Sequence, residues 1–256
     1  MAEMILLGVG TGVPDADREN THMVWNGPGG PLLIDVGGST YQRLLRAGID
    51  PPNLAGVFLT HSHPDHIHGL PVLLFSIGLA GRRAPLPIYG LGDTLAIAEE
   101  LCRAMRLDYS YVVQPLWRSI AAGESRELAA DWQLDTALTA HSKPCLATRF
   151  VHRSGAALVY SCDTEPCIAV EDLARGAQIL IHEATTAGPF AGHTSPQQAG
   201  EVAARAGVGQ LVLVHYSPRW TMPETEALAA VYRGGFQGVA AVGREGQRLS
   251  LDITLL

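Results

Sequence analysis

Three histidines and one aspartate lie within six consecutive positions, in the run H-S-H-P-D-H at residues 61–66. Neutral imidazole and carboxylate groups suit zinc and related first-row divalent ions. The proline at position 64 argues against a regular helix through the run, so we expect an extended loop with alternating side chains. In such a loop His61 and His63 point to one metal ion, while Asp65 and His66 turn toward a second ion.

Three more residues that can bind metal follow predicted strands farther along the chain. The strand-like segments 132–140, 158–162 and 211–214 are followed by His141, Asp163 and His215. Loops beyond strand ends are where α/β folds place their sites. A single residue of this kind is usually a cap or a turn residue. Because segment 54–60 also ends on His61, four strands end on potential ligands, and together they predict one site.

Strand-like and helix-like segments alternate along the chain, which is the pattern of an α/β fold. The remaining predicted strands are 4–9, 31–36, 86–89, 179–182 and 249–255, with a hairpin formed by 147–152 and 156–161. The mixed segment 107–120 contains aromatic and β-branched residues that favour strands. The predicted helices are 40–47, 68–79, 94–105, 168–174, 196–206 and 224–232. Neither a repeat nor a low-complexity linker interrupts this pattern. We therefore expect one continuous α/β domain over residues 1–256.

Composition and charge narrow the class of protein. No run of 18 apolar residues is present, and the N-terminal segment lacks the pattern of a signal peptide, so we expect a cytoplasmic protein without a membrane span. The four cysteines show no C-x-x-C spacing, which favours buried free thiols over zinc ligands. The net charge of −7 argues against a broad nucleic-acid-binding surface but leaves room for a small arginine patch.

Several motifs resemble those of one enzyme family. They are L-G-V-G-T-G-V-P at 7–14, Y-S-C-D-T at 160–164, H-E-A-T at 182–185, G-H-T-S-P-Q-Q-A at 192–199 and H-Y-S-P-R-W at 215–220. Together with the run at 61–66, they resemble the metallo-β-lactamase-fold hydrolases, and within these the ribonuclease Z group. The resemblance spans nearly the whole chain. It implies a four-layer αββα sandwich, commonly assembled as a homodimer.

The resemblance also implies a role for each candidate ligand. His61, His63 and His141 bind one zinc ion, Asp163 bridges the two ions, and the second ion is bound by Asp65, His66 and His215. Zinc is the expected metal, with manganese or iron as alternatives. Two ions about 3.5–4 Å apart can hold a hydroxide between them as the nucleophile. Because seven ligands leave open positions for water and substrate, the site is expected to be catalytic rather than structural.

Three further residues are assigned to catalysis or substrate binding. His193 is the candidate general acid, because an imidazole can protonate a leaving alkoxide near neutral pH. Glu183 is the candidate partner that orients His193 or a ligand. Arg219 is the candidate group that binds an anionic phosphoryl oxygen. The alternatives are a polar residue at a helix start, a buried carboxylate bonded to backbone donors, and a surface salt bridge.

The implied activity is that of a dinuclear zinc-dependent phosphodiesterase. Typical tRNA-processing members carry an arm that grips tRNA between the residues matching His141 and Asp163, whereas only about 21 residues separate them here. The arm is therefore expected to be absent, and the substrate is expected to be a small ester, with RNA as an alternative. Other hypotheses are an arylsulfatase-like or lactonase-like hydrolase, a tRNA 3′-processing endoribonuclease, and a non-catalytic carrier on the same fold.

Overall fold

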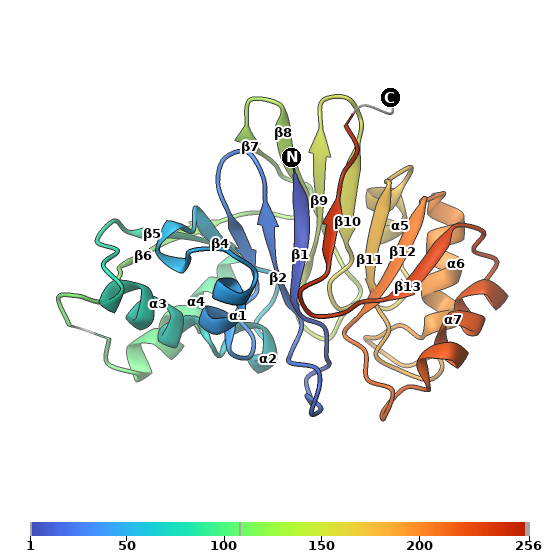
Figure 1. Ribbon diagram of the computed structural model, residues 1–256, viewed down its shortest axis with the longest axis horizontal. Coiled ribbons are helices and arrows are strands. Elements are labelled where there is room, and N and C mark those ends of the chain that lie inside the picture. The colour runs from blue at the N-terminus through green and yellow to red at the C-terminus, as the bar shows by residue number, and fades with distance from the viewer. Residues whose placement is uncertain (1, 108, 254–256) are drawn as a thin grey trace.

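A computed structural model describes residues 2–107 and 109–253, which form two seven-stranded sheets packed face to face (Figure 1). In spatial order the first sheet contains β14 (Arg248–Ser250), β1 (Glu3–Gly8), β2 (His22–Asn26), β3 (Leu32–Ile34), β4 (Gly56–Leu59), β5 (Leu86–Gly90) and β6 (Pro115–Ser119). The second contains β13 (Val239–Val242), β12 (Gln210–Val214), β11 (Ile179–Glu183), β10 (Ala157–Tyr160), β9 (Leu146–His152), β8 (Trp132–Leu138) and β7 (Ser125–Ala129).

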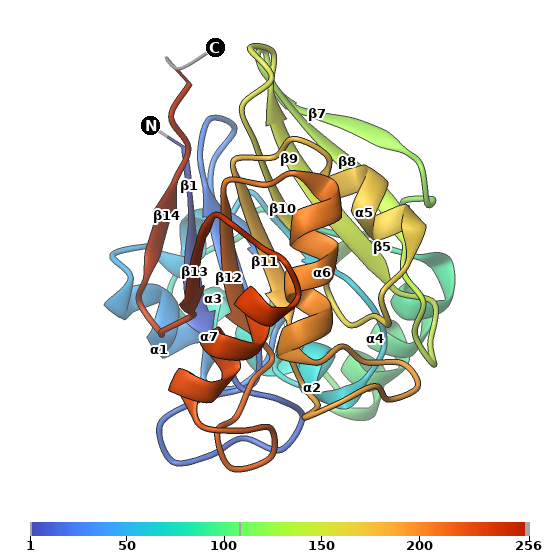
Figure 2. The ribbon, with the colours of Figure 1, turned by 90° about the vertical axis from the view of Figure 1, so that its right-hand side faces the viewer.

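Helices cover the outer face of each sheet (Figures 1 and 2). On the first sheet lie α1 (Thr40–Arg46), α3 (Leu70–Leu79) and α4 (Gly92–Ala104), with the short 3-10 helix η1 (Pro51–Asn53) beside α1 and α3. On the second sheet lie α5 (Ile168–Ala174), α6 (Pro196–Ala206) and α7 (Glu224–Arg233). The order helix, sheet, sheet, helix confirms the predicted αββα sandwich. None of the helices in the described ranges is long and apolar enough to cross a membrane.

Alternation along the strands explains why the chain forms these layers. In β1, Met4 and Leu6 point into the core between the sheets, whereas Ile5 and Leu7 pack under the helices of the first sheet. Successive side chains of a strand face opposite sides, so a strand that is apolar at every position is buried on both faces. All six residues of β1 are buried accordingly.

The structure extends the predicted set of elements. The strands β2, β7 and β13 and the one-turn helix α2 (Pro64–Ile67) were not predicted. The predicted strand 249–255 is shorter, because β14 covers Arg248–Ser250 and residues 254–256 lie outside the described part of the chain. The predicted hairpin is confirmed, since β9 and β10 pair antiparallel. This hairpin occupies most of the chain between His141 and Asp163 and carries no further arm.

Candidate metal centre

The histidine run lies directly after β4, and its conformation differs in part from the prediction. His63 is extended, with φ −65° and ψ 145°, but Pro64 begins the helix α2, which contains Asp65 and His66. The prediction of an extended loop through the whole run was therefore wrong. Proline is favoured at the first helical position because its fixed φ suits a helix and its missing N–H is not needed there. The helical turn places Asp65 and His66 beside His215, while the ring of His66 stays in contact with that of His61, with 4.1 Å between the ring centroids.

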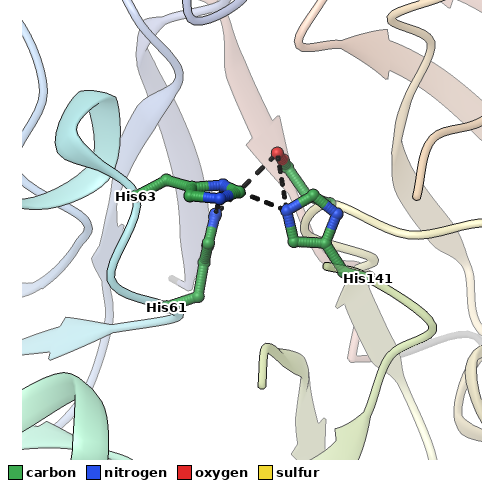
Figure 3. Close-up of side chains that lie close together, drawn as sticks. His61, His63 and His141 are labelled. Carbon is green, nitrogen blue, oxygen red and sulfur yellow. Dashed lines mark hydrogen bonds and ion pairs between the residues drawn. The ribbon is translucent and has the colours of Figure 1, made fainter. Parts of the chain in front are cut away.

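Four residues form the first cluster of potential ligands: His61, His63, His141 and Asp163. His63 Nδ1 lies 3.0 Å from His61 Nε2 and 3.1 Å from His141 Nε2. Asp163 Oδ2 lies 3.9 Å from the Nε2 atoms of both His61 and His141. Figure 3 shows His61 and His63 approaching from one side and His141 from the other. Ligand atoms about 2.0–2.2 Å from a tetrahedral zinc ion lie about 3.3–3.6 Å apart, so these spacings are near those of a metal site.

Asp65, His66 and His215 form the second cluster beside the first. Asp65 Oδ2 lies 3.4 Å from His66 Nε2 and 3.4 Å from His215 Nε2. Asp163 lies between the two clusters, because its Oδ1 is 3.7 Å from His66 Nε2 and its Oδ2 is 3.6 Å from His215 Nε2. The structure thus brings together all seven residues that were predicted as ligands.

Unpaired buried atoms show that these residues fit a cation. His66 Nε2 and Asp163 Oδ1 are buried and have no hydrogen-bond partner among the residues that the structure describes. Buried polar atoms are normally paired, and a site for an ion is one of the accepted explanations for an exception. A neutral imidazole nitrogen and a carboxylate oxygen are both zinc ligands. The cluster is therefore suited to a metal, with zinc as the metal that the donor set favours.

Each histidine whose Nε2 points toward a cluster makes a hydrogen bond through its other ring nitrogen, Nδ1. The partners of Nδ1 are Thr60 Oγ1 for His61 at 3.1 Å, Asp35 Oδ2 for His66 at 2.7 Å, the Gly192 carbonyl for His141 at 2.7 Å, and Thr185 Oγ1 for His215 at 2.7 Å. Metal-binding histidines almost always donate their second N–H in this way, which fixes the ring and its tautomer. These supporting contacts are typical of a metal site.

Two buried carboxylates lie behind this layer of contacts. Asp35 accepts hydrogen bonds from His66 Nδ1 and from the Thr60 hydroxyl, which in turn contacts His61. Glu183 accepts a bond from the Thr185 hydroxyl at 2.7 Å. Sequence analysis did not identify Asp35, Thr60 or Thr185. Asp35 follows an apolar strand and adopts the left-handed conformation, with φ 59°, which aspartate tolerates, but neither feature indicates its contact with His66.

Without a cation, the site holds opposite charges close together. Burial lowers the pKa of His66, but Asp35 and Asp163 raise it to about 10. Burial raises the pKa of Asp163, but the neighbouring His215, His66 and His61 reduce it well below its usual range. Asp163 thus stays ionised and attracts a positive charge, which protons supply when metal does not. Metal binding and protonation compete for the same atoms.

His193 lies beside the clusters with its Nδ1 2.9 Å from Glu183 Oε1. Burial lowers the pKa of His193, but the hydrogen bond and the charge of Glu183 raise it, with a net upward direction. Glu183 also accepts backbone N–H bonds from Thr164 and Thr185, so the predicted contact and its alternative are both present. The His193 ring stacks 5.8 Å from that of His215. His193 is thus held at the edge of the metal-binding residues.

A cavity of about 280 Å³ opens onto both clusters. Its wall includes Asp65, Asp163, His193 and His215. Trp220 is part of this wall, whereas Arg219 is not. The guanidinium carbon of Arg219 lies 4.8 Å from the centre of the Trp220 ring. A contact between Arg219 and substrate stays a prediction.

Comparisons with known proteins agree with this geometry. A family model described as the β-lactamase superfamily domain matches residues 32–216. The ribonuclease Z of Methanothermobacter thermautotrophicus is 30% identical over 90% of this chain and 91% of its own. The chain belongs to the ribonuclease Z group of metallo-β-lactamase-fold proteins. Membership of this group, together with the clustered ligands, makes it a metal-dependent hydrolase of the ribonuclease Z type.

Solved structures show the same fold. The metallo-β-lactamase fold protein YhfI from Bacillus subtilis superposes with a TM-score of 0.81 at 21% identity, covering 98% of this chain and 99% of that one. The short form of human tRNase Z gives a TM-score of 0.77 at 22% identity, with 98% and 99% covered. Both similarities extend over nearly the whole chain.

Proposed function

We propose that this chain is a dinuclear metallohydrolase that cleaves phosphodiesters. The observation that carries this proposal is the position of Asp163, which lies between a cluster of three histidines and a cluster of one aspartate and two histidines. A carboxylate in that position can bridge two ions. Seven ligands for two ions leave open positions for water and substrate, which a closed structural site does not.

The chain's own residues supply the rest of the chemistry. Two divalent ions held there would lower the pKa of a water molecule to about 7 and polarise a phosphoryl oxygen. His193 then protonates the leaving oxygen through Nε2, because its Nδ1 is bonded to Glu183. Asp65, the other proposed catalytic residue, would bind the second ion beside His215, whose Nε2 lies 3.4 Å from Asp65 Oδ2. Zinc is the proposed metal, and manganese or iron would suit the same nitrogen and oxygen donors.

Three features favour small diesters over tRNA. The connection between His141 and Asp163 contains the β9–β10 hairpin and no arm. The net charge is −7, whereas nucleic-acid surfaces are usually basic. The alignment with the 31% identical ribonuclease Z of Mycobacterium bovis extends over 277 residues, more than the 256 of this chain, so that relative contains segments missing here.

RNA 3′-end cleavage is the second candidate. It is favoured by the identity of about 30% to several proteins named ribonuclease Z, over most of the chain. Since the protein lacks the arm, another surface would have to bind the RNA. A homodimer is one source of such a surface, and it stays a prediction that light scattering in solution tests.

The decisive experiment combines metal analysis with a substrate panel. We expect two ions per chain and faster turnover of a chromogenic phosphodiester than of an aryl sulfate, a lactone or a precursor tRNA. A fully active enzyme with one ion or none would refute the dinuclear site. A higher kcat/KM for precursor tRNA than for the diester would establish the second candidate instead.

The role of His193 can be separated from metal binding. We expect His193→Ala to retain both ions and to lose about 10²–10⁴-fold in kcat on a diester with an alkoxide leaving group. The loss should be much smaller with a nitrophenolate, which leaves without a proton. His152→Ala, on β9 at the end remote from the site, is the control and should leave both rates unchanged. Equal losses on both substrates would assign His193 to positioning.

A further inference from the structure

A half-exposed tryptophan forms part of the wall of the catalytic cavity. Trp220 is 50% exposed and lines the cavity together with Asp65, His193 and His215. By contrast, Trp25 and Trp132 are buried in the core between the sheets. A tryptophan left partly in water forgoes a large burial energy. Its position beside the metal-binding residues suggests that a ligand covers it.

The backbone that carries Trp220 is fixed by hydrogen bonds. The N–H groups of Trp220 and Thr221 both donate to the Ser217 carbonyl, at 3.1 and 2.9 Å. The Thr221 hydroxyl donates to the Thr185 carbonyl at 2.9 Å, and the Ser217 hydroxyl donates to Asp15 at 2.9 Å. The indole is therefore carried by a closed turn, which hydrogen bonds connect to Thr185 and to Asp15. An aromatic ring held in this way binds with little loss of conformational entropy.

The surroundings of the ring favour a flat, apolar partner. Arg219 covers the ring from one side with its guanidinium carbon 4.8 Å from the ring centre, while the indole also faces the cavity. Val13 lines the same cavity and is 59% exposed. Phe190 is 63% exposed and accepts a backbone hydrogen bond from His193 at 3.2 Å. The charged clusters at the bottom of the cavity thus have apolar side chains at their edge.

We propose that Trp220 is a stacking platform that selects phosphoesters carrying a planar aromatic group, either a nucleobase or an aryl ring. This inference rests on the proposed function, because the phosphoryl group is taken to bind at the two clusters. The cavity of about 280 Å³ is near the lower end of the range of small-molecule sites, which suits one nucleotide-sized group. Stacking on an aromatic side chain tolerates every base, so the platform selects planarity rather than sequence.

Binding of three phosphate monoesters to the zinc-loaded protein tests the platform. We expect adenosine 5′-monophosphate to bind at least about 10-fold more tightly than ribose 5-phosphate. Trp220→Ala should abolish this preference, and Trp220→Phe should keep most of it. Tyr232→Ala, which removes a 48% exposed aromatic side chain on α7, is the matched control and should not change it. Phenyl phosphate distinguishes the aryl ring from the nucleobase as the preferred group. A preference that survives in Trp220→Ala would overturn the proposal.

A measurement without metal separates this inference from the proposed function. The indole resonance of Trp220, assigned by its loss in Trp220→Phe, should shift on addition of adenosine to the metal-free protein and should not shift with ribose. If adenosine causes the shift but none of the phosphates binds the zinc-loaded protein, the proposed function is refuted and the platform stands. If the phosphates bind but adenosine causes no shift, the platform is refuted and the proposed function stands.

Discussion

Asp35 and Glu183 are two buried carboxylates that orient four histidines of the site. Asp35 contacts His66 directly and His61 through Thr60. Glu183 contacts His193 directly and His215 through Thr185. Both carboxylates are fully buried, so water does not compete for the hydrogen bonds that they accept. Each of the two carboxylates therefore orients one histidine directly and a second histidine through a threonine hydroxyl.

Replacement of Asp35 tests this arrangement. Asp35→Asn keeps the shape and tolerates the left-handed φ of 59°, but it removes the charge that polarises His66. We expect the affinity for metal to fall about 10–100-fold, with a matching loss of activity at low metal concentration. Competition with a chromophoric chelator measures the affinity. Asp135→Asn, on β8, is the control; the same loss in both variants would contradict a specific role for Asp35.

Sequence alone indicated the candidate metal ligands, but it did not indicate the residues that hydrogen-bond to those ligands and orient them. His61, His63 and Asp65 stand in one short run, and the types and spacing of such a run indicate a metal site by themselves. The role of Asp35 depends on its lying next to His66, 31 residues later in the chain. A contact of that kind exists only after β3 and β4 have paired. No local pattern encodes it.

At the scale of elements, helices and strands that a local sequence pattern defines were predicted, whereas elements that depend on a neighbouring strand were missed. The predicted helices 168–174 and 196–206 match α5 and α6, because periodic apolar residues define both helices locally and Ser195 caps the start of α6. The strand β7 was missed because it is a polar edge strand, and β13 because its edge position leaves Val239 64% exposed. Edge strands bury too little to show a clear alternation. Their existence depends on the neighbouring strand.

The contact between α6 and α7 gives a prediction at this scale. Gly200, inside α6, lies so close to α7 that a Cβ would be 2.2 Å from the Val231 carbonyl oxygen. Alanine usually stabilises a helix interior by about 1 kcal/mol relative to glycine. Here we expect Gly200→Ala to destabilise the protein by about 1–3 kcal/mol, because two backbones must separate. Urea denaturation measures the change.

A neighbouring position in the same helix provides the control for Gly200. Ala204 is exposed on α6, so Ala204→Gly should cost only the propensity difference of about 1 kcal/mol. If Gly200→Ala raised the free energy of unfolding by a similar amount, propensity would outweigh the packing of α6 on α7. The close approach of these helices would then not limit stability.

At the scale of the whole molecule, the layers determine which groups lose contact with water. The αββα order was predicted through the family resemblance, whereas the burial of single polar residues was not. His22, on β2, is 1% exposed, and its Nδ1–H donates to the Asn20 carbonyl at 2.8 Å. Its Nε2 has no partner in the described part of the chain. The fold therefore holds this imidazole neutral within the first sheet.

Burial of His22 predicts that acid destabilises the protein. Burial lowers the pKa of His22 to about 4 in the folded protein, whereas the unfolded chain keeps about 6.5. Below pH 6.5 the unfolded state therefore binds a proton that the folded state does not, and stability falls as the pH decreases from 6.5 to 4. We expect His22 to contribute a loss of about 2 kcal/mol in the free energy of unfolding between pH 7 and pH 5.

Urea denaturation at each pH measures this loss, and a chelator in the buffer removes the separate effect of metal. In His22→Gln, which keeps a side-chain donor but cannot titrate, the loss over this pH range should be smaller by that amount. An unchanged pH dependence in the variant would show that other groups, such as the metal-binding histidines, account for the acid sensitivity.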